Sequence, residues 1–201
     1  MSLEQAPTRA VLLSLREERE VVGEAYNFLD EKRLLLAAEI IQQLKEYENL
    51  REKLEAQTRK ARQQLVAATA RHGLQGLSVY PALALKSVEL QSHQRNFMGV
   101  QLRERSLEAE PGTININDIC RPTAEAEACR QLFHEITLTS TKLAGLSGNL
   151  YRLVREYRLT QRRARALENV IIPELEGQLR DTSVYLEEMD MEDVIRARGG
   201  R

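Results

Sequence analysis

The stretch Arg162-Arg163-Ala164-Arg165-Ala166-Leu167-Glu168-Asn169-Val170-Ile171-Ile172-Pro173 lies inside a helical pattern that runs from about Thr123 to about Ala197. Apolar residues recur here every seven positions on two lines, which is the narrow seam of a coiled coil. A helix of about 75 residues would be about 110 Å long. No single globular domain of this size could hide it, so the pattern predicts a long helical partner. The first line is Cys129, Ile136, Leu143, Leu150, Tyr157, Ala164 and Ile171, and the second is Leu132, Thr139, Leu146, Leu153, Thr160 and Leu167.

A second helical pattern opens at Pro7-Thr8-Arg9 and continues without proline to about Arg71, with the same seven-residue repeat. Two such helices in one chain most simply fold back on each other as an antiparallel, left-handed, two-stranded coiled coil with both termini at one end. If Arg71 faces Thr123, facing residue numbers add up to about 195, within one or two helical turns. The lines are Leu15, Val22, Leu29, Leu36 and Leu50, and Leu12, Tyr26, Ile40, Tyr47, Leu54, Ala61 and Ala68.

Polar residues interrupt this first seam at Arg19, Arg33, Gln43 and Gln57. One interpretation is that they fix the register or extend out of the seam to reach water. The other is that they present polar groups to a surrounding partner.

The glycines of His72-Gly73-Leu74-Gln75-Gly76 predict the end of the first helix. The expected organisation is an N-terminal shaft helix over 1–71, a small mixed head over 72–122 at one end of the helical hairpin, and a C-terminal helix with a frayed tail over 123–201. Residues 79–85, 97–102 and 113–119 have strand-like composition, so the head is expected to contain a β-hairpin or a short helix. The fold class is otherwise all-α.

Basic residues cluster at one level of the predicted hairpin. The register places Lys32 and Arg33 beside Arg162 and Arg163, and only Glu156 opposes the charge of the second helix over this region. The basic residues of both helices at this level form a predicted basic collar. The collar is either a contact for acidic loops of a partner or an ordinary solvated face. On the second helix the collar comprises Arg152, Arg155, Arg158, Arg162, Arg163 and Arg165.

Two features should disturb the second helix. Gly145 and Gly148 each cost about 1 kcal/mol of helix propensity, so we expect either close approach of a facing tyrosine, Tyr47, or a notch where a second protein docks. Pro173 removes a backbone donor and predicts a kink. Around it the apolar line changes to four-residue steps, a stutter that relaxes the supercoil. That line is Ile171, Leu175, Leu179, Thr182, Leu186 and Met189.

Composition narrows the function. The chain is 29% charged, only 4% aromatic and lacks tryptophan, and its net charge is -1. Such a chain is rich in helix formers and does not have a generally nucleic-acid-binding surface. Residues 1–5 do not have the basic and apolar character of a signal peptide, and no later window approaches 18 uncharged apolar residues, so we expect a soluble chain. Cys120 and Cys129 are too few for a disulfide framework, so reduced thiols in the cytoplasm are expected.

Catalytic chemistry is not indicated. There is no glycine-rich phosphate-binding loop, and His72, His93 and His134 are scattered without metal-ligand or nucleophile spacing. We therefore expect no catalytic residue, no metal site and no cofactor.

The segment Arg162 to Pro173 closely resembles the signature of the D subunit, the central rotor shaft of V-type and A-type rotary ATPases. In that family two arginines precede an asparagine-alanine-leucine-glutamate segment and an aliphatic run that ends in proline. The chain departs at Ala164 and Arg165, where valine and asparagine are usual, and it lacks the usual lysine-rich C-terminus. The segments Pro7-Thr8-Arg9 and Asn96-Phe97-Met98-Gly99-Val100 are also similar to the family, although Arg103 replaces a common proline.

This resemblance implies a non-catalytic central-stalk rotor protein that transmits torque between the ATP-hydrolysing or ATP-synthesising ring and the membrane ion-translocating rotor. The implied partners are the A and B subunits of the ring, the small F subunit of the stalk and a socket protein on the membrane rotor. The implied location is the cytoplasmic side of the membrane, peripheral, without a membrane span. The predicted partner contacts are Lys32, Arg33, Arg162, Arg163, Arg165, Gly145 and Gly148.

Two other classes stay open on the sequence. A coiled-coil tether or adaptor predicts a homodimer through the seam. A nucleic-acid binder would use Arg152 to Arg165, but the acidic flanks and scarce aromatics oppose it.

Overall fold

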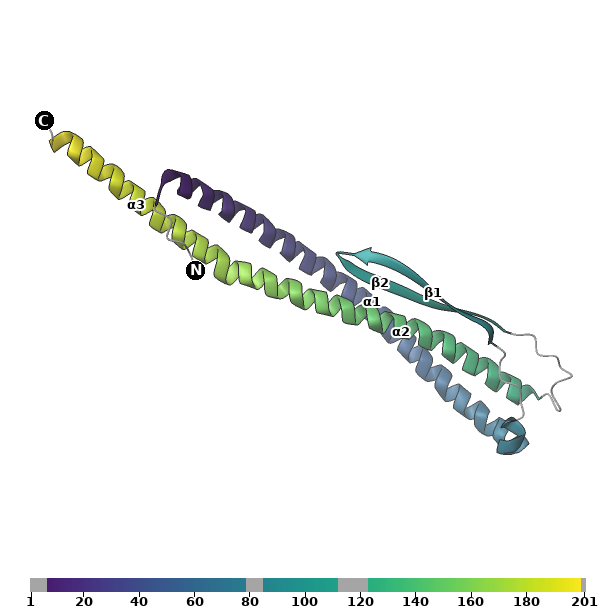
Figure 1. Cartoon of the computed structure of the whole chain (residues 1–201). Coiled ribbons are helices and arrows are strands. Elements are labelled where there is room, and N and C mark those ends of the chain that lie inside the picture. Colours follow the sequence, from purple (N-terminus) through teal and green to yellow (C-terminus); the bar gives the residue numbers. More distant parts are fainter. Residues whose placement is uncertain (1–6, 79–84, 112–122, 200–201) are drawn as a thin grey trace. The chain divides into compact units, whose positions relative to one another are not determined.

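The computed structural model describes residues 7–78, 85–111 and 123–199. In chain order its elements are helix α1, strands β1 and β2, helix α2, the π-helical turn η2 and helix α3 (Figure 1). The predicted fold class is confirmed: two long helical stretches pair in coiled-coil fashion and a β-hairpin comes from the middle of the chain. The elements are α1 (Arg9–Ser78), β1 (Leu85–Phe97), β2 (Val100–Pro111), α2 (Ala124–Ala166), η2 (Leu167–Ile171) and α3 (Ile172–Gly199).

The chain divides into two compact units. The terminal unit contains residues 1–37 and 156–201, and the central unit contains residues 38–155. Each unit pairs a segment of α1 with a segment of the second half of the chain, and each is described by itself below.

The terminal unit has a narrow core. Leu36 is fully buried, and Thr160, Ala164 and Leu175 are buried on the other helical stretch. Cross-helix ion pairs fix the direction of the pairing, because rising numbers on α1 meet falling numbers on its partner. The numbers of each pair add up to about 195, within about two turns, as the predicted antiparallel register requires. The pairs are Arg9–Asp190, Arg19–Glu176 and Lys32–Glu156.

Helix α1 starts at a cap. The hydroxyl oxygen of Thr8 accepts a hydrogen bond from the backbone N–H of Val11 at 3.3 Å, which satisfies one of the free donors of the first turn. Pro7 therefore precedes the helix, which begins at Arg9 at the end of the predicted opening Pro7-Thr8-Arg9.

The irregularity predicted at Pro173 takes the form of a π turn. Residues Leu167–Ile171 are π-helical, and the N–H of Ile172 bonds the carbonyl of Leu167 five residues back. Proline has no N–H to donate to the carbonyl four residues back, and its ring needs space there, so one extra residue in the preceding turn relieves both problems.

The π turn also corrects the predicted apolar line. Ile171 is exposed, whereas Ile172 is half-buried and Leu175 is buried. Because one residue is inserted, the repeat passes from Ala164 to Ile172 and from Leu167 to Leu175, and then returns to steps of seven. The stutter through Ile171 is therefore wrong by one position, and Met189 at its end is also exposed.

The central unit buries the predicted seam residues of its own helices. Ala61, Ala68, Cys129 and Leu153 are buried, together with the polar seam residue Thr139. Burial raises the pKa of the Cys129 thiol, which is consistent with an inert core residue. At its far end α1 loses helical geometry at Gly73, where φ is 68°, close to the predicted helix end at Arg71.

The hairpin joins β1 and β2 as an antiparallel pair with Phe97 opposite Val100. Its two-residue turn, Met98-Gly99, has positive φ at both positions, 48° and 83°. This is the conformation of a type I′ turn, whose twist matches that of the strands it joins. The predicted strand over 97–102 is therefore wrong, because the turn lies inside it. Most of the predicted stretch 79–85 and all of 113–119 lie outside the described residues.

Within the central unit the hairpin lies alongside the helices instead of forming a head beyond their end (Figure 1). Leu102 of β2 is almost completely buried. Arg95 of β1 bonds Glu39 of α1, and Arg103 of β2 bonds Asn149 of α2. A run of 13 residues in β1 is long enough to return about 40 Å along the helices, which explains how the tip reaches these positions.

Candidate partner-contact site

The α1 members of the predicted collar are neutralised within the terminal unit. The Lys32 ammonium lies 2.7 Å from a Glu156 carboxylate oxygen, and only 15% of the lysine side chain is exposed. Arg33 pairs with Asp30 one turn earlier at 2.6 Å. The α1 side of the collar therefore contributes little free positive charge.

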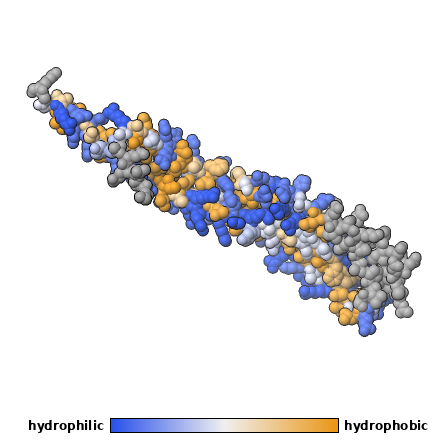
Figure 2. All heavy atoms as spheres, in the orientation of Figure 1, coloured by the Kyte–Doolittle hydropathy of each residue, from blue (hydrophilic) through white to orange (hydrophobic). Residues whose placement is uncertain are grey.

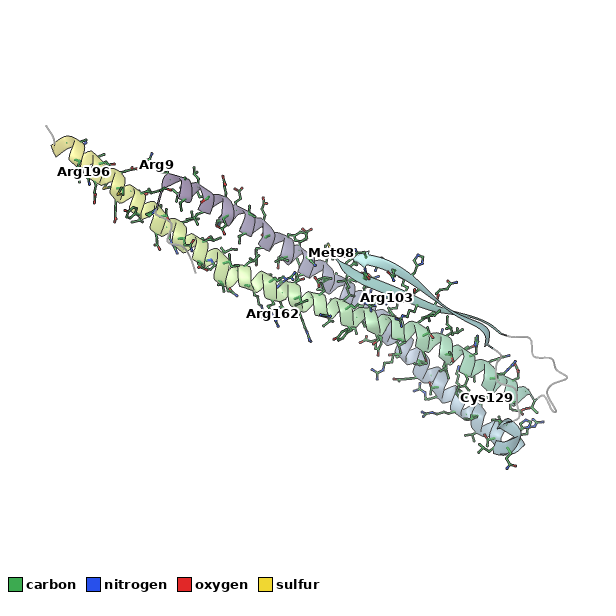
Figure 3. All side chains as sticks on the ribbon, viewed as in Figure 1. Arg9, Met98, Arg103, Cys129, Arg162 and Arg196 are labelled. Carbon is green, nitrogen blue, oxygen red and sulfur yellow. The ribbon has the colours of Figure 1, made fainter. Side chains whose placement is uncertain are left out.

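The α2 members of the collar differ from the α1 members in exposure and in ion pairing. Arg162, Arg163 and Arg165 are all exposed, and none makes a salt bridge with any residue in the described ranges. Figure 3 shows Arg162 projecting outward from α2. Arg158, one turn earlier, is also exposed. We call Arg158, Arg162, Arg163 and Arg165 the arginine row.

The arginine row has the electrostatics of a contact surface. Four like charges within about two helical turns repel one another, and none of the four forms an ion pair with a carboxylate of the described chain. An acidic partner would remove this repulsion and gain charge-assisted hydrogen bonds. Guanidinium groups suit this role because their planar donors match a carboxylate in two-point contact.

The seam arginines and glutamines make their bonds within the chain. Gln43 donates to Glu39 at 2.8 Å, and Gln57 donates to Glu135 at 3.2 Å. Arg19 and Arg33 form the ion pairs already described. Arg19 and Gln57 reach the opposite helical stretch, which favours the interpretation that these two fix the register, whereas Gln43 and Arg33 bond within α1.

Gly145 is a site of close approach, but not to Tyr47. A Cβ added at Gly145 would lie 3.4 Å from the Cβ of Arg105 and 3.7 Å from the carbonyl oxygen of Arg103. β2 therefore packs on α2 at this position with room for little more than a methyl group, and the chain itself fills the predicted notch. At Gly148 an added Cβ would meet only the Arg152 guanidinium, at 3.7 Å.

Asn149 holds β2 against α2 and was not identified from the sequence. Its side chain is 2% exposed. Its carbonyl oxygen accepts from the Arg103 N–H at 2.8 Å, and its amide nitrogen donates to the Arg103 carbonyl at 3.2 Å. The amide thus pairs with one residue of the strand as a neighbouring strand would, and it satisfies both backbone groups.

Arg152 shares this anchor. Its guanidinium donates to Asn149 Oδ1 at 2.5 Å. Partial burial lowers the pKa of Arg152, and the nearby charges of Arg103 and Arg105 lower it further. The guanidinium remains charged at neutral pH, because arginine is protonated in proteins.

A polar network ties the hairpin tip to α1. Glu39 is buried and accepts from Arg95 at 2.6 Å as well as from Gln43. The Arg95 guanidinium also lies 5.7 Å from the centre of the Phe97 ring, a distance suited to a cation–π contact. The network satisfies a carboxylate that would otherwise be costly to bury.

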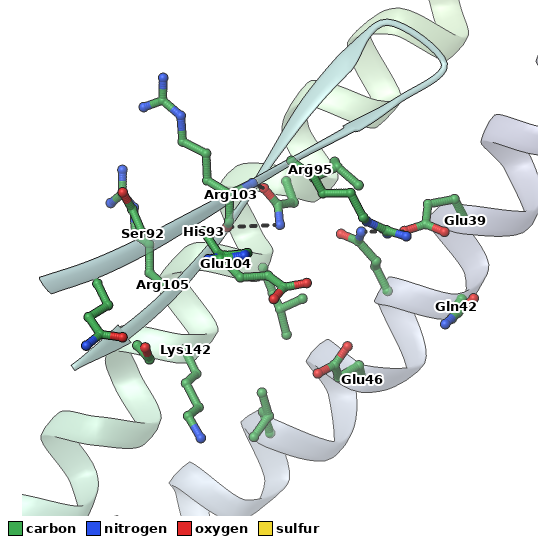
Figure 4. A pocket seen from close by; sticks show the side chains of 17 residues that line it. Glu39, Gln42, Glu46, Ser92, His93, Arg95, Arg103, Glu104, Arg105 and Lys142 are labelled. Atoms are coloured by element: carbon green, nitrogen blue, oxygen red, sulfur yellow. Dashed lines mark hydrogen bonds and ion pairs between the residues drawn. The ribbon is translucent and has the colours of Figure 1, made fainter. Parts of the chain in front are cut away.

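Below the hairpin lies a polar groove of about 800 Å³. Figure 4 shows that Glu46, Glu104 and Lys142 direct their charged ends into it from α1, β2 and α2. None of these three side chains forms an ion pair with another described residue. Figure 2 shows that hydrophilic atoms dominate the surface over the hairpin.

The described residues lack the features of a membrane-spanning helix and of a metal site. No described helix combines the length and the apolar character that crossing a bilayer requires. No cluster of three or more histidine, cysteine or acidic side chains in the same ranges is arranged to hold a metal ion.

Comparison with known proteins decides the family. The family model that describes the D subunit of ATP synthase matches residues 11–198, which includes both long helices and the hairpin. The chain belongs to the ATP synthase D subunit family. The resemblance carried by Arg162 to Pro173 is thereby confirmed.

Curated members of the D subunit family match along nearly their whole length. The D subunit of the V-type ATP synthase of Thermotoga neapolitana is 25% identical over 193 residues, which cover 96% of this chain and 95% of that protein. The D subunit of the A-type ATP synthase of Methanosarcina mazei is 28% identical over 200 residues, covering 96% and 93%. That of Thermococcus sibiricus is 30% identical over 203 residues, covering 98% and 92%.

Proposed function

We propose that this chain is the non-catalytic central-stalk rotor protein of a V/A-type ATPase or ATP synthase. The observation that carries the proposal is the match to the D subunit family over residues 11–198. The chain would sit peripherally on the cytoplasmic side of the membrane. It would contact the A and B subunits of the ring, the small F subunit of the stalk and the socket protein of the membrane rotor, and would transmit torque between ring and membrane.

The terminal unit supports this proposal with its mechanical construction. A helical pair whose seam is buried within one chain does not depend on a second copy, as a tether dimerising through the same seam would. Leu36 and Thr160 are almost completely buried in the single chain. Cross-helix ion pairs then resist sliding of one helix along the other, which a shaft under torque requires.

The arginine row supplies the proposed contact with the ring. Rotation of an asymmetric surface would bring these charges successively to acidic loops of neighbouring ring proteins. Long-range attraction between opposite charges favours such encounters and weakens with salt.

The first experiment asks whether the chain couples the two parts of the motor. A complex assembled without this chain should hydrolyse ATP in its ring without pumping ions, and adding the chain back should restore pumping. Ion pumping that persists in the complex without the chain would contradict the rotor role.

The second experiment tests the arginine row. The triple substitution Arg162→Gln, Arg163→Gln and Arg165→Gln should lower the number of ions pumped per ATP hydrolysed by at least about threefold, because the charges that contact the ring are lost. Arg59→Gln, Lys60→Gln and Arg62→Gln form a matched control, because they remove three exposed charges at the same spacing. Equal coupling in both triple variants, with unchanged helix content, would show that the row is only a solvated face.

A further inference from the structure

The two outer edges of the hairpin differ in whether their backbone groups have hydrogen-bond partners in the central unit. The outer edge of β2 faces α2, where Asn149 satisfies the N–H and the carbonyl of Arg103. The outer edge of β1 receives no such partner from any residue that the structure describes.

The strand register shows which backbone groups form the free edge. In an antiparallel pair, facing residues alternate between those that bond each other and those whose N–H and carbonyl point outward. Gln94 faces Arg103, and Arg103 directs both groups outward to Asn149. Gln94 must therefore direct its own N–H and carbonyl outward on the opposite edge.

The same alternation extends along β1. Ser92 and Asn96 lie two residues to either side of Gln94, so their backbone groups point the same way, as do those of Leu90. The side chains of Leu90, Ser92, Gln94 and Asn96 are all exposed. The result is an open row of four donors and four acceptors at the spacing of a strand.

This edge lacks the features that usually prevent pairing. Proteins protect edges with lysine, proline, bulges or a covering element. Between Leu90 and Phe97 there is no proline or lysine, and the single register irregularity lies at the other end of the strand, between Leu85 and Val88. The Arg95 side chain, which could otherwise guard the edge, is turned to Glu39 on α1.

The groove beside this edge indicates the chemistry of its occupant. Arg95 connects β1 to α1, so a strand added to β1 would lie over the α1 wall of the groove. That wall presents Glu46, and Glu104 enters from β2, both without an ion pair in the described chain. The cations that line the groove without an ion pair, Arg103, Arg105 and Lys142 among the described residues, come from β2 and α2 and not from the α1 wall.

We propose that the outer edge of β1 binds an extended segment of another protein of the complex, which adds a third strand to the sheet. The segment is polar and carries a lysine or arginine that reaches Glu46 and Glu104. Main-chain hydrogen bonds to Ser92, Gln94 and Asn96 supply affinity, and the basic side chain supplies selectivity. This inference rests on the proposed function, because it takes the partner from the assembled rotary complex.

A second copy of the chain is a poorer occupant. Pairing of two β1 edges would bring two identical α1 walls to one groove, and their unpaired glutamates would repel one another. A basic segment from a different protein meets no such opposition.

Hydrogen exchange resolved to single amides tests the proposal on the purified chain and on the complex purified from cells that produce it. The amides of His93 and Arg95 bond within the hairpin and should be protected in both samples. The amides of Ser92, Gln94 and Asn96 should exchange freely in the chain and at least about tenfold more slowly in the complex. Equal exchange of these three amides in both samples overturns the proposal, as does protection already present in the isolated chain.

A variant pair tests the same edge by assembly. Gln94→Pro removes only an outward N–H, which an edge strand tolerates, whereas Gln94→Ala removes the side chain and keeps the donor. The proline variant should lose the slow exchange of Ser92 and Asn96 in the complex, and the alanine variant should keep it. Retention of slow exchange in the proline variant also overturns the proposal.

The two proposals fail in distinguishable ways. If the wild-type chain does not co-purify with the ring proteins, the proposed function is wrong. If it co-purifies and restores pumping while its β1 amides exchange freely, only the strand-addition site is wrong.

Discussion

The terminal and central units use polar groups differently. In the terminal unit ion pairs join the helices, and two of the three are exposed, with Arg9 and Asp190 at 76% and 62%. In the central unit buried polar side chains, Asn149 and Glu39, hold the hairpin to the helices. Exposed ion pairs contribute at most about 1 kcal/mol each, whereas a buried polar group without its partner costs more. The terminal unit should therefore depend on apolar burial and the central unit on polar anchors.

The sharpest test of the terminal unit is Leu36→Ala. Leu36 is completely buried, so truncation should cost about 2–5 kcal/mol through lost burial and a cavity. Its neighbour Leu34 is 60% exposed, and Leu34→Ala should change the free energy of unfolding by less than about 0.5 kcal/mol. Denaturant unfolding of both variants gives the comparison. Similar losses in the two variants would mean that the seam does not set the stability of this unit.

In the central unit the matching test is Asn149→Ala. The substitution leaves the N–H and carbonyl of Arg103 without their partner and should cost about 2–3 kcal/mol. That corresponds to a fall in Tm of roughly 4–12 °C for a chain of this size. Ser147→Ala, at an exposed position on the same helix, is the control. An unchanged Tm in the Asn149 variant would place the anchoring of β2 elsewhere, with Leu102 the next residue to examine.

The smallest expected effect distinguishes packing from helix propensity at Gly145. An alanine Cβ would meet Arg105 at 3.4 Å, an ordinary contact, so Gly145→Ala should be neutral or should stabilise the helix by up to about 1 kcal/mol. Gly145→Val adds branches that reach the β2 backbone and should cost about 1–2 kcal/mol. Thermal unfolding monitored by circular dichroism measures both. If valine were tolerated as well as alanine, β2 would not be in contact with α2 at this point.

Periodicity was enough to predict the helices, whereas composition predicted the hairpin only as one of two possibilities for the middle of the chain and did not predict its position along the helices. Leu36, Leu153 and Ala164 are buried where the seven-residue repeat predicted. The seam of a coiled coil follows from the spacing of apolar residues along each helix, which can be read directly from the sequence. The strands of the hairpin are rich in charged and polar residues, and their stability comes from Leu102, Glu39 and Asn149, which are distant in sequence. No local pattern could show those contacts.

The candidate site also combines features that the sequence predicted with features that only the fold shows. The sequence singled out Arg162, Arg163 and Arg165, and they are exposed. It could not show that Glu156 and Asp30 neutralise Lys32 and Arg33, since those pairs depend on the register between helices and on rotamers. Gly145 was noticed for its cost to the helix, and the strand that uses the vacant space was visible only in the fold.

The π turn at Leu167–Ile171 has a consequence for how the molecule can change over evolution or in the laboratory. Deleting a residue from an uninterrupted helix rotates everything downstream by about 100°, which moves buried side chains to the surface. Here the surplus residue is already accommodated, so a deletion within the turn, combined with replacement of Pro173, would leave Leu175 facing inward. Length changes that would ruin the seam elsewhere can therefore be tolerated at this one place.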